Sequence, residues 1–207
     1  MNTVITIGRQ FGSGGYEIGS KVAEHFGIPF LDKELVTKAA KDSGFCEEII
    51  SNHDERPTNS FLYNLVMDTY SFGYNAAQFV DMPISHKVFL AQFDTIKRIA
   101  DDGPCVIVGR CADYALSERT NVLNIFIYAK EEDKTKAVVA QHNLDPGKAR
   151  EMCIKMDKQR KSYYDYYTSK KWGRADSYDI CINSSALGRD GAVRLIVKCV
   201  EEFEGRG

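Results

Sequence analysis

The sequence has no pattern typical of a metal centre or a disulfide framework. Its six cysteines include no C-x-x-C pair, and its four histidines are scattered along the chain. Cys105 and Cys181 lie inside apolar runs typical of buried strands, and Cys199 falls on the apolar face of the last predicted helix. We therefore interpret the thiols as small buried side chains in a reducing compartment, and not as disulfides or zinc ligands.

Long apolar runs and a strong net charge are also missing. No stretch reaches the roughly 18 apolar residues that a membrane-spanning helix needs, and the first residues show no charged-then-apolar signal pattern. The net charge of −2 gives no overall attraction to nucleic acid or membranes. With 207 residues, 43% of them hydrophobic and 27% charged, we expect one sizeable cytoplasmic domain with an added lid or insertion.

A glycine-rich turn separates the first apolar run from the first helical pattern. Residues 4–7 are apolar or β-branched, residues 8–15 are rich in glycine, and a helical pattern that ends at Phe26 follows. The backbone N–H groups of such a turn, with the N-terminus of the next helix, can bind a phosphate. Gly15 and Tyr16 stand where the P-loop pattern G-x-x-x-x-G-K-[ST] has lysine and a hydroxyl residue. A tight strand-to-helix turn without a ligand is the alternative interpretation.

Apolar runs and helical patterns alternate along the chain. The predicted strands cover residues 4–7, 28–32, 105–109, 122–128 and 178–183. The later predicted helices cover residues 33–43, 86–102, 130–141 and 192–203, with one more that begins at Pro146 behind the N-cap Asp145. This alternation predicts an α/β fold with a parallel sheet covered on both faces, in which ligands bind beyond the carboxyl ends of the strands.

Residues 45–85 differ from the rest of the chain, because their periodicity is weak and aromatic side chains are frequent. We predict an inserted helical segment there. Its aromatic residues, between 61 and 79, either form a satellite core under the insertion or provide a base-stacking platform or a homodimer surface.

Two charged residues lie at the carboxyl ends of predicted strands. Arg110 lies after the strand 105–109, where its planar guanidinium can clamp a phosphate or a carboxylate; a structural pairing with Asp113 or a helix C-terminus is the alternative. Asp32 ends the strand 28–32. Its carboxylate is suited to hold a base, a ribose hydroxyl or an acceptor group, or to cap the helix that follows.

Residues 155–174 form a basic stretch in a chain of negative net charge, with seven basic residues against two aspartates. Aromatic residues follow the first basic cluster: Tyr163, Tyr164, Tyr166, Tyr167 and Trp172. We interpret the stretch first as a mobile lid that brings cations over transferring phosphates. A solvated helix face ranks second, and a nucleic-acid surface ranks third.

Several of these stretches together resemble the cytidylate kinase-like proteins of the P-loop nucleoside monophosphate kinase superfamily. The matching stretches are residues 7–15, 29–32, 106–114 and 157–160, the pairs Tyr163-Tyr164 and Trp172-Gly173, and the pair Tyr178-Asp179. The resemblance implies a single kinase-like domain with a three-layer P-loop NTPase fold and a five-stranded parallel sheet. It places the core in residues 1–44, 86–142 and 175–207, a helical acceptor-side insertion in 45–85 and a basic helical lid in 143–174.

The resemblance also implies ATP-dependent phosphoryl transfer, with Mg²⁺, to a nucleoside monophosphate such as CMP or dCMP. By position, the donor phosphates would lie against Gly12, Ser13, Gly14, Gly15 and Tyr16. The acceptor would lie against Asp32, Arg110 and Asp113. The residues that act in the transfer would be Arg110, Arg160 and Lys158. The metal ligands stay unassigned.

The chain departs from authentic cytidylate kinases at the phosphate loop and after the Gly-Arg step. Gly15 and Tyr16 replace a lysine and a small or hydroxyl residue, and Cys111 stands where those enzymes have an aspartate. We hypothesise that Arg9 or a lid cation replaces the missing lysine. Two other functions stay open: a nucleotide-binding regulator or pseudo-kinase, and a nucleic-acid-binding module that uses residues 155–174.

Overall fold

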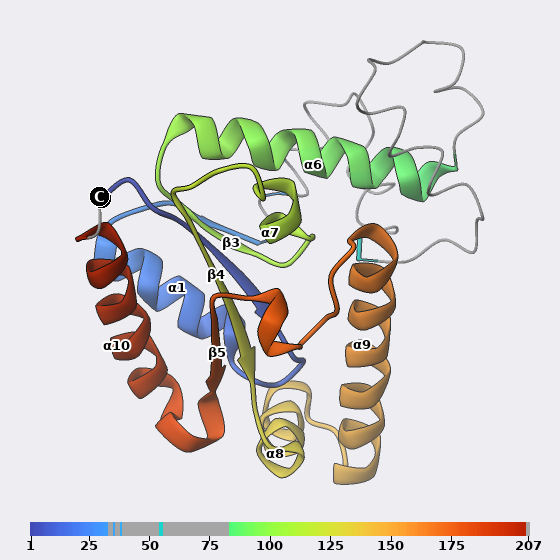
Figure 1. Ribbon diagram of the computed structural model, residues 1–207. Coiled ribbons are helices and arrows are strands. Elements are labelled where there is room, and N and C mark those ends of the chain that lie inside the picture. Colours follow the sequence, from blue (N-terminus) through green and yellow to red (C-terminus); the bar gives the residue numbers. More distant parts are fainter. Residues whose placement is uncertain (33–34, 36–37, 39–53, 56–82, 206–207) are drawn as a thin grey trace.

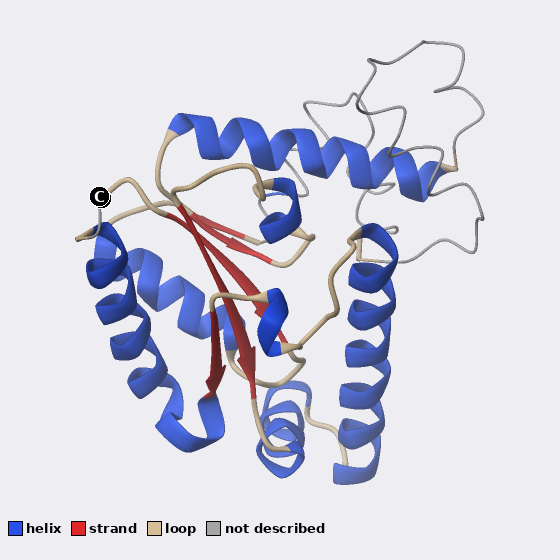
Figure 2. Cartoon of the chain, viewed as in Figure 1, coloured by secondary structure: helices blue, strands red, loops and turns tan. Residues whose placement is uncertain are grey.

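The computed structural model describes residues 1–32, 35, 38, 54–55 and 83–205 (Figure 1). Most of the predicted helix 33–43, most of the insertion 45–85 and the whole aromatic segment 61–79 therefore lie outside the described residues. The described part contains a five-stranded parallel sheet with helices on both faces (Figure 2). This arrangement confirms the predicted three-layer α/β fold.

The strands are β1 (Val4–Arg9), β2 (Phe30–Leu31), β3 (Val106–Val108), β4 (Val122–Tyr128) and β5 (Ile180–Asn183), in the order β2-β3-β1-β4-β5. Strand β1 is central, with Ile5 opposite Val106 on one side and Leu123 on the other. It continues past its predicted end at Ile7, because its pairing with β4 extends to Arg9. This extension brings Arg9 to the carboxyl edge of the sheet.

Alternate side chains of β1 enter different apolar layers, as the two-residue period of a strand requires. Ile5 and Ile7 pack in one cluster with α1 (Gly15–Phe26) and α10 (Ser184–Glu204). Val4 packs in another with α6 (Ile84–Asp102) and α7 (Ala112–Ala115). In Figure 1, α1 and α10 therefore lie on one side of the sheet, and α6 and α7 on the other.

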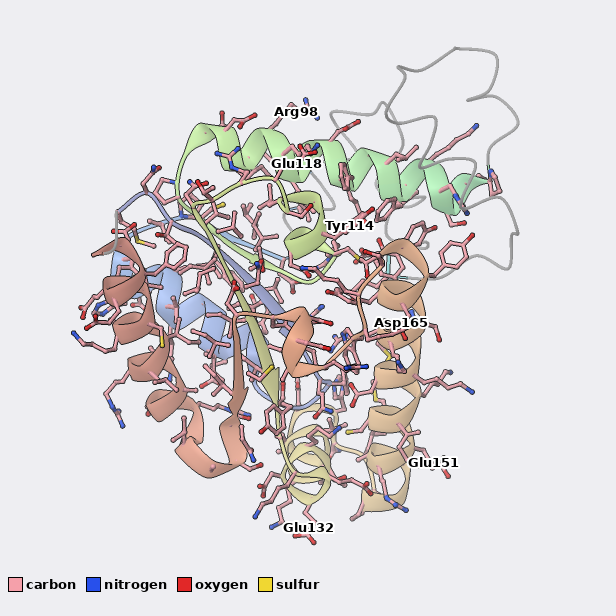
Figure 3. The ribbon with its side chains drawn as sticks, in the orientation of Figure 1. Arg98, Tyr114, Glu118, Glu132, Glu151 and Asp165 are labelled. Carbon is pink, nitrogen blue, oxygen red and sulfur yellow. The ribbon has the colours of Figure 1, made fainter. Side chains whose placement is uncertain are left out.

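Helices α8 (Glu131–His142) and α9 (Pro146–Tyr167) pack against each other beyond the carboxyl ends of the strands. The Asp145 side chain accepts a hydrogen bond from the Lys148 N–H, and Pro146 follows it, so the predicted helix start is confirmed. Glu132 and Glu151, near the outer ends of the two helices, point away from the sheet (Figure 3).

The aromatic residues near the end of α9 belong to the core. The buried members are Tyr163, Tyr164 and Tyr167. They share a cluster with Phe89 of α6 and Phe126 of β4, and the ring centroids of Phe89 and Tyr167 are 4.0 Å apart. These three tyrosines therefore offer no exposed faces on which nucleic-acid bases could stack.

Some elements differ from the predicted ranges. Helix α6 begins at Ile84, inside the range predicted for the insertion. Helix α10 begins at Ser184, well before residue 192, and is kinked at Gly188, whose φ is 68°. Helix α7 and the 3₁₀ helix η1 (Ala175–Ser177) are too short to leave a periodic pattern in the sequence. In the described ranges, no helix combines the length and the apolar character needed to cross a membrane.

Candidate functional site

The glycine-rich turn connects the end of β1 to the start of α1. Gly12 and Gly14 have φ angles of 77° and 83°, which a residue with a Cβ atom rarely adopts. Ser13 is buried, and its hydroxyl donates to the Gln10 carbonyl at 2.8 Å, which closes the turn. In the turn, the backbone N–H groups of Gly12, Gly14, Gly15 and Tyr16 make no hydrogen bond to the described residues. With the positive end of α1, these donors can bind an oxyanion.

The side chain of Arg9 explains why position 15 is a glycine. A Cβ atom on Gly15 would lie 2.6 Å from the Cβ and 3.0 Å from the Cγ of Arg9. Both atoms lie close to the backbone of a central strand, so they cannot easily move aside. The position of the P-loop lysine is therefore closed to any side chain, and the Arg9 stem passes directly beside it.

A cleft of about 530 Å³ opens beside the turn. The turn contributes Gln10, Phe11, Gly12, Gly14, Gly15 and Tyr16 to its wall. Cations on the wall are Arg9, Arg160 and Arg189. Tyr16 is 54% exposed at this wall and contacts the Phe30 ring edge-on, with 5.1 Å between the centroids. The cleft therefore combines turn amides that bond none of the described residues with guanidinium groups, which suits a polyanionic ligand.

Arg9 and Arg160 both contact Glu55. Two nitrogens of Arg9 donate to the two carboxylate oxygens of Glu55 at 2.6 and 3.3 Å, and Arg160 Nε lies 3.5 Å from Glu55 Oε2. Burial alone would raise the pKa of Glu55, but Arg9, Arg160 and Arg110 outweigh it and hold this pKa well below its ordinary value. Burial and the neighbouring Arg9 lower the pKa of Arg160 to about 10.

Arg110 is buried among other carboxylates. Its guanidinium contacts Asp32 and donates to Asp54 at 2.9 Å and to the Val108 carbonyl at 2.8 Å. Burial alone would lower the pKa of Arg110, but Asp54, Glu55 and Asp32 together raise it. The structure therefore brings the predicted pair Asp32 and Arg110 together, and no bond joins Arg110 to Asp113, the structural partner considered from the sequence.

Asp113 forms a second polar group with Tyr164 and Lys170. It is buried, accepts a hydrogen bond from the Tyr164 hydroxyl at 2.6 Å and lies 3.5 Å from the Lys170 ammonium. Burial raises the pKa of Asp113 despite these two partners. A small pocket of about 20 Å³, with Arg9, Arg110 and Asp113 in its wall, has room for about one water molecule.

The structure does not bring Lys158 to the site. Lys158 lies on the exposed face of α9, whereas Arg160 and Asp157 of the same helix face the turn. Asp157 accepts from the Phe11 N–H at 2.6 Å and from the Lys134 ammonium at 2.7 Å. One face of α9 therefore holds the turn, and Lys158 is directed away from it.

Several residues of the site were missed in the sequence. Asp54 and Glu55 are adjacent acids in a stretch of weak periodicity, so nothing marked them as core partners of arginines. Asp157 lay in the basic stretch, but one aspartate among lysines is a weak signal. Arg189 follows the kink at Gly188, lies beside Gly14 and pairs with Glu17 of α1; no sequence pattern indicated this contact.

Comparisons with known proteins agree with this geometry. A sequence model described as the cytidylate kinase-like family matches residues 4–186. A crystal structure of an uncharacterized protein from Eubacterium ventriosum ATCC 27560 is 32% identical, with a TM-score of 0.73 over 96% of this chain and 98% of that one. No curated protein matches the chain.

More distant solved structures share the fold. A shikimate kinase from Bacteroides thetaiotaomicron is 10% identical, with a TM-score of 0.55 over 97% of this chain and 99% of that one. A gluconokinase from Sinorhizobium meliloti 1021 is 12% identical, with a TM-score of 0.53 over 100% of this chain and 98% of that one.

Proposed function

The chain belongs to the cytidylate kinase-like family, and from this premise we propose that it transfers a phosphoryl group from ATP to a nucleoside monophosphate such as CMP or dCMP. Phosphoryl transfer depends mainly on positioning and on neutralising charge, so it needs N–H donors and cations more than a covalent nucleophile. The turn and the three arginines Arg9, Arg110 and Arg160 meet that need.

The residues of the cleft fit the donor nucleotide. The unbonded N–H groups of the turn face a space of about 530 Å³, which is in the range of small-molecule sites. We assign the donor phosphates to the turn residues Gly12, Ser13, Gly14, Gly15 and Tyr16. Arg9 takes over the role of the P-loop lysine, because its stem passes beside Gly15.

Mg²⁺ is expected to accompany the nucleotide and to neutralise charge that develops on its phosphates. The described residues contain no group of three or more His, Cys, Asp and Glu side chains suited to hold a metal ion. Mg²⁺ commonly needs only one or two protein carboxylates in addition to phosphates and water. Asp32 and Glu17, the carboxylates on the cleft wall, fit that requirement.

We assign the acceptor to Asp32, Arg110 and Asp113. Arg110 and Asp32 contact each other at the sheet edge where ligands of parallel sheets bind. Arg160, held near the turn by its bond to the Arg9 carbonyl, supplies charge over the transferring group. Lys158 would have to reach the cleft from the exposed face of α9, so it is the weakest of these assignments.

The observation that carries the proposal is the convergence of Arg9, Arg110 and Arg160 beside a turn whose N–H donors bond none of the described residues. ADP release is the test: purified protein with ATP and Mg²⁺ is screened against nucleoside monophosphates and small hydroxylated acceptors. We expect ADP that depends on one acceptor, and its loss in Arg9→Ala but not in the exposed control Arg150→Ala. ATP binding without acceptor-dependent ADP for any compound would refute the proposal.

A second candidate is a nucleotide-binding regulator that does not turn over. It is favoured by the carboxylates Glu55, Asp32 and Asp54, which already neutralise the arginines. Such a protein would be stabilised by ATP, as ligands that bind only the folded state do. Thermal unfolding would then show a nucleotide-dependent rise in melting temperature, and the ADP-release screen would show no ADP.

A further inference from the structure

We propose that Arg9 and Arg160 form an oxyanion-binding site that Glu55 occupies as an internal competitor, and from which a phosphoryl group displaces it. The inference rests on the proposed function only in taking the ligand's anionic group to be a phosphoryl group. It does not require that transfer takes place.

The contacts of Glu55 are those expected for a bound anion. Its two oxygens meet two Arg9 nitrogens at 2.6 and 3.3 Å, the side-by-side geometry by which arginine binds carboxylates and phosphates alike. Oε1 also lies 3.4 Å from the backbone N–H of Arg110, and Oε2 lies 3.5 Å from Arg160 Nε. A carboxylate therefore sits where a phosphoryl group would find the same donors.

One hydrogen-bond donor close to the Glu55 carboxylate lacks an acceptor among the described residues. Arg160 Nε is buried and finds no hydrogen-bond acceptor among the described residues, although it lies 3.5 Å from Glu55 Oε2. A buried donor without an acceptor is costly. A phosphoryl group offers one more oxygen than a carboxylate, so it can satisfy Arg160 and Arg9 together.

The two arginines are accessible from a side that Glu55 does not block. Arg9 and Arg160 line both the small pocket and the cleft beside the turn, whereas Glu55 lines only the small pocket. A ligand whose phosphates follow the turn would therefore meet the guanidinium groups from the cleft. Glu55 itself has a φ of 50°, a left-handed conformation that is uncommon for a residue with a side chain.

Competition between Glu55 and the ligand predicts the direction in which removal of Glu55 changes the affinity for an anion. If Glu55 competes with the ligand, its removal makes anion binding tighter. If Glu55 only positions the arginines, its removal makes binding weaker. Charged hydrogen bonds of this kind are strong enough for a change of about tenfold.

The experiment measures the affinity of the full chain for inorganic phosphate by calorimetry. We expect Glu55→Gln, which keeps the shape and removes the charge, to bind phosphate about tenfold more tightly than the wild type. The matched control is Glu131→Gln, which removes the same charge from an exposed pair with Arg150 and should leave the affinity unchanged. Arg9→Ala combined with Glu55→Gln should lose the gain.

Equal or weaker binding by Glu55→Gln would overturn the proposal. If that variant does not fold, Glu55→Asp withdraws the carboxylate from Arg9 by one methylene and should still bind phosphate more tightly than the wild type. Tighter phosphate binding without turnover would leave this inference standing while the kinase proposal fails. Turnover without tighter phosphate binding would overturn this inference and leave the kinase proposal standing.

Discussion

Replacing Arg110 with alanine tests whether the charges of the site are arranged as described. The Arg110 side chain is 5% exposed and contacts Asp32 and Asp54, as well as the Val108 carbonyl at 2.8 Å. Its removal leaves two largely buried carboxylates without the cation that faces them. Breaking a buried ion pair from one side costs about 3–5 kcal/mol, because the remaining charge stays buried.

That loss of folding stability should be measurable by thermal and urea unfolding. For a chain of this size, 1 kcal/mol shifts the melting temperature by about 2–4 °C, so Arg110→Ala should melt roughly 6–20 °C below the wild type. Urea unfolding should show a lower midpoint with an unchanged slope, since the folded structure is kept. The control Arg150→Ala, at an exposed pair with Glu131, should show no measurable change.

A triple variant separates the cost of the buried carboxylate charges from the cost of losing the packing of the Arg110 side chain. Arg110→Ala with Asp32→Asn and Asp54→Asn also removes the two carboxylate charges that faced Arg110, so it should recover part of the stability lost in Arg110→Ala. A loss of less than about 1 kcal/mol in Arg110→Ala would refute the reasoning, because a carboxylate already hydrated or paired elsewhere does not need the guanidinium.

Three further outcomes are expected. Gly15→Ala should lower the free energy of unfolding by about 1–3 kcal/mol, because the new methyl group overlaps Arg9; Gly205→Ala, at the C-terminal end of α10, where a new Cβ would come no closer than 3.4 Å to its neighbours, should not, and equal stability of the two variants would contradict the packing. Arg9→Ala should weaken ATP binding by about tenfold or more in calorimetry, and unchanged affinity would exclude Arg9 as the substitute for the lysine. The pKa of Glu55 is held below its ordinary 4.5, so its stabilisation is complete above that pH and is lost as the pH falls further; without phosphate, the stability gap between wild type and Glu55→Gln should shrink below pH 4.5, and a constant gap would contradict the pairing.

The sheet was predictable because its strands are strongly apolar and separated by clear stop signals. Residues 122–128 form β4 with the predicted bounds, and Asp145 caps α9 as its side chain and the following Pro146 indicated. The end of β1 was misplaced because Gly8 was taken as a stop. In the fold, pairing with β4 continues through that glycine to Arg9.

The partners of the site residues were harder to predict than the residues themselves. Arg110 and Asp32 were found because each directly follows an apolar run, and their contact follows from parallel strands meeting at one edge. Glu55 was not found, because a carboxylate carries no signal of the arginine it meets 46 residues away along the chain.

Prediction from the sequence was limited in the same way for the basic stretch 155–174. From its charge and aromatic content, the stretch 155–174 was interpreted first as a basic lid, but Tyr163 and Tyr167 are core residues and Asp157 holds the turn. Helical position decides which of these side chains faces inward. The irregular spacing of the aromatic residues hid that division in the sequence.

Phosphorus NMR of the reaction itself tests the central claim most directly. The wild-type protein is incubated with ATP, Mg²⁺ and the acceptor found in the screen, and the γ-phosphate is followed over time. A site built from the turn and the three arginines predicts loss of the ATP γ-signal and growth of a phosphorylated-acceptor signal, both abolished in Arg9→Ala. An unchanged γ-signal with a protein that binds ATP, or release of inorganic phosphate alone, would contradict phosphoryl transfer to a small-molecule acceptor.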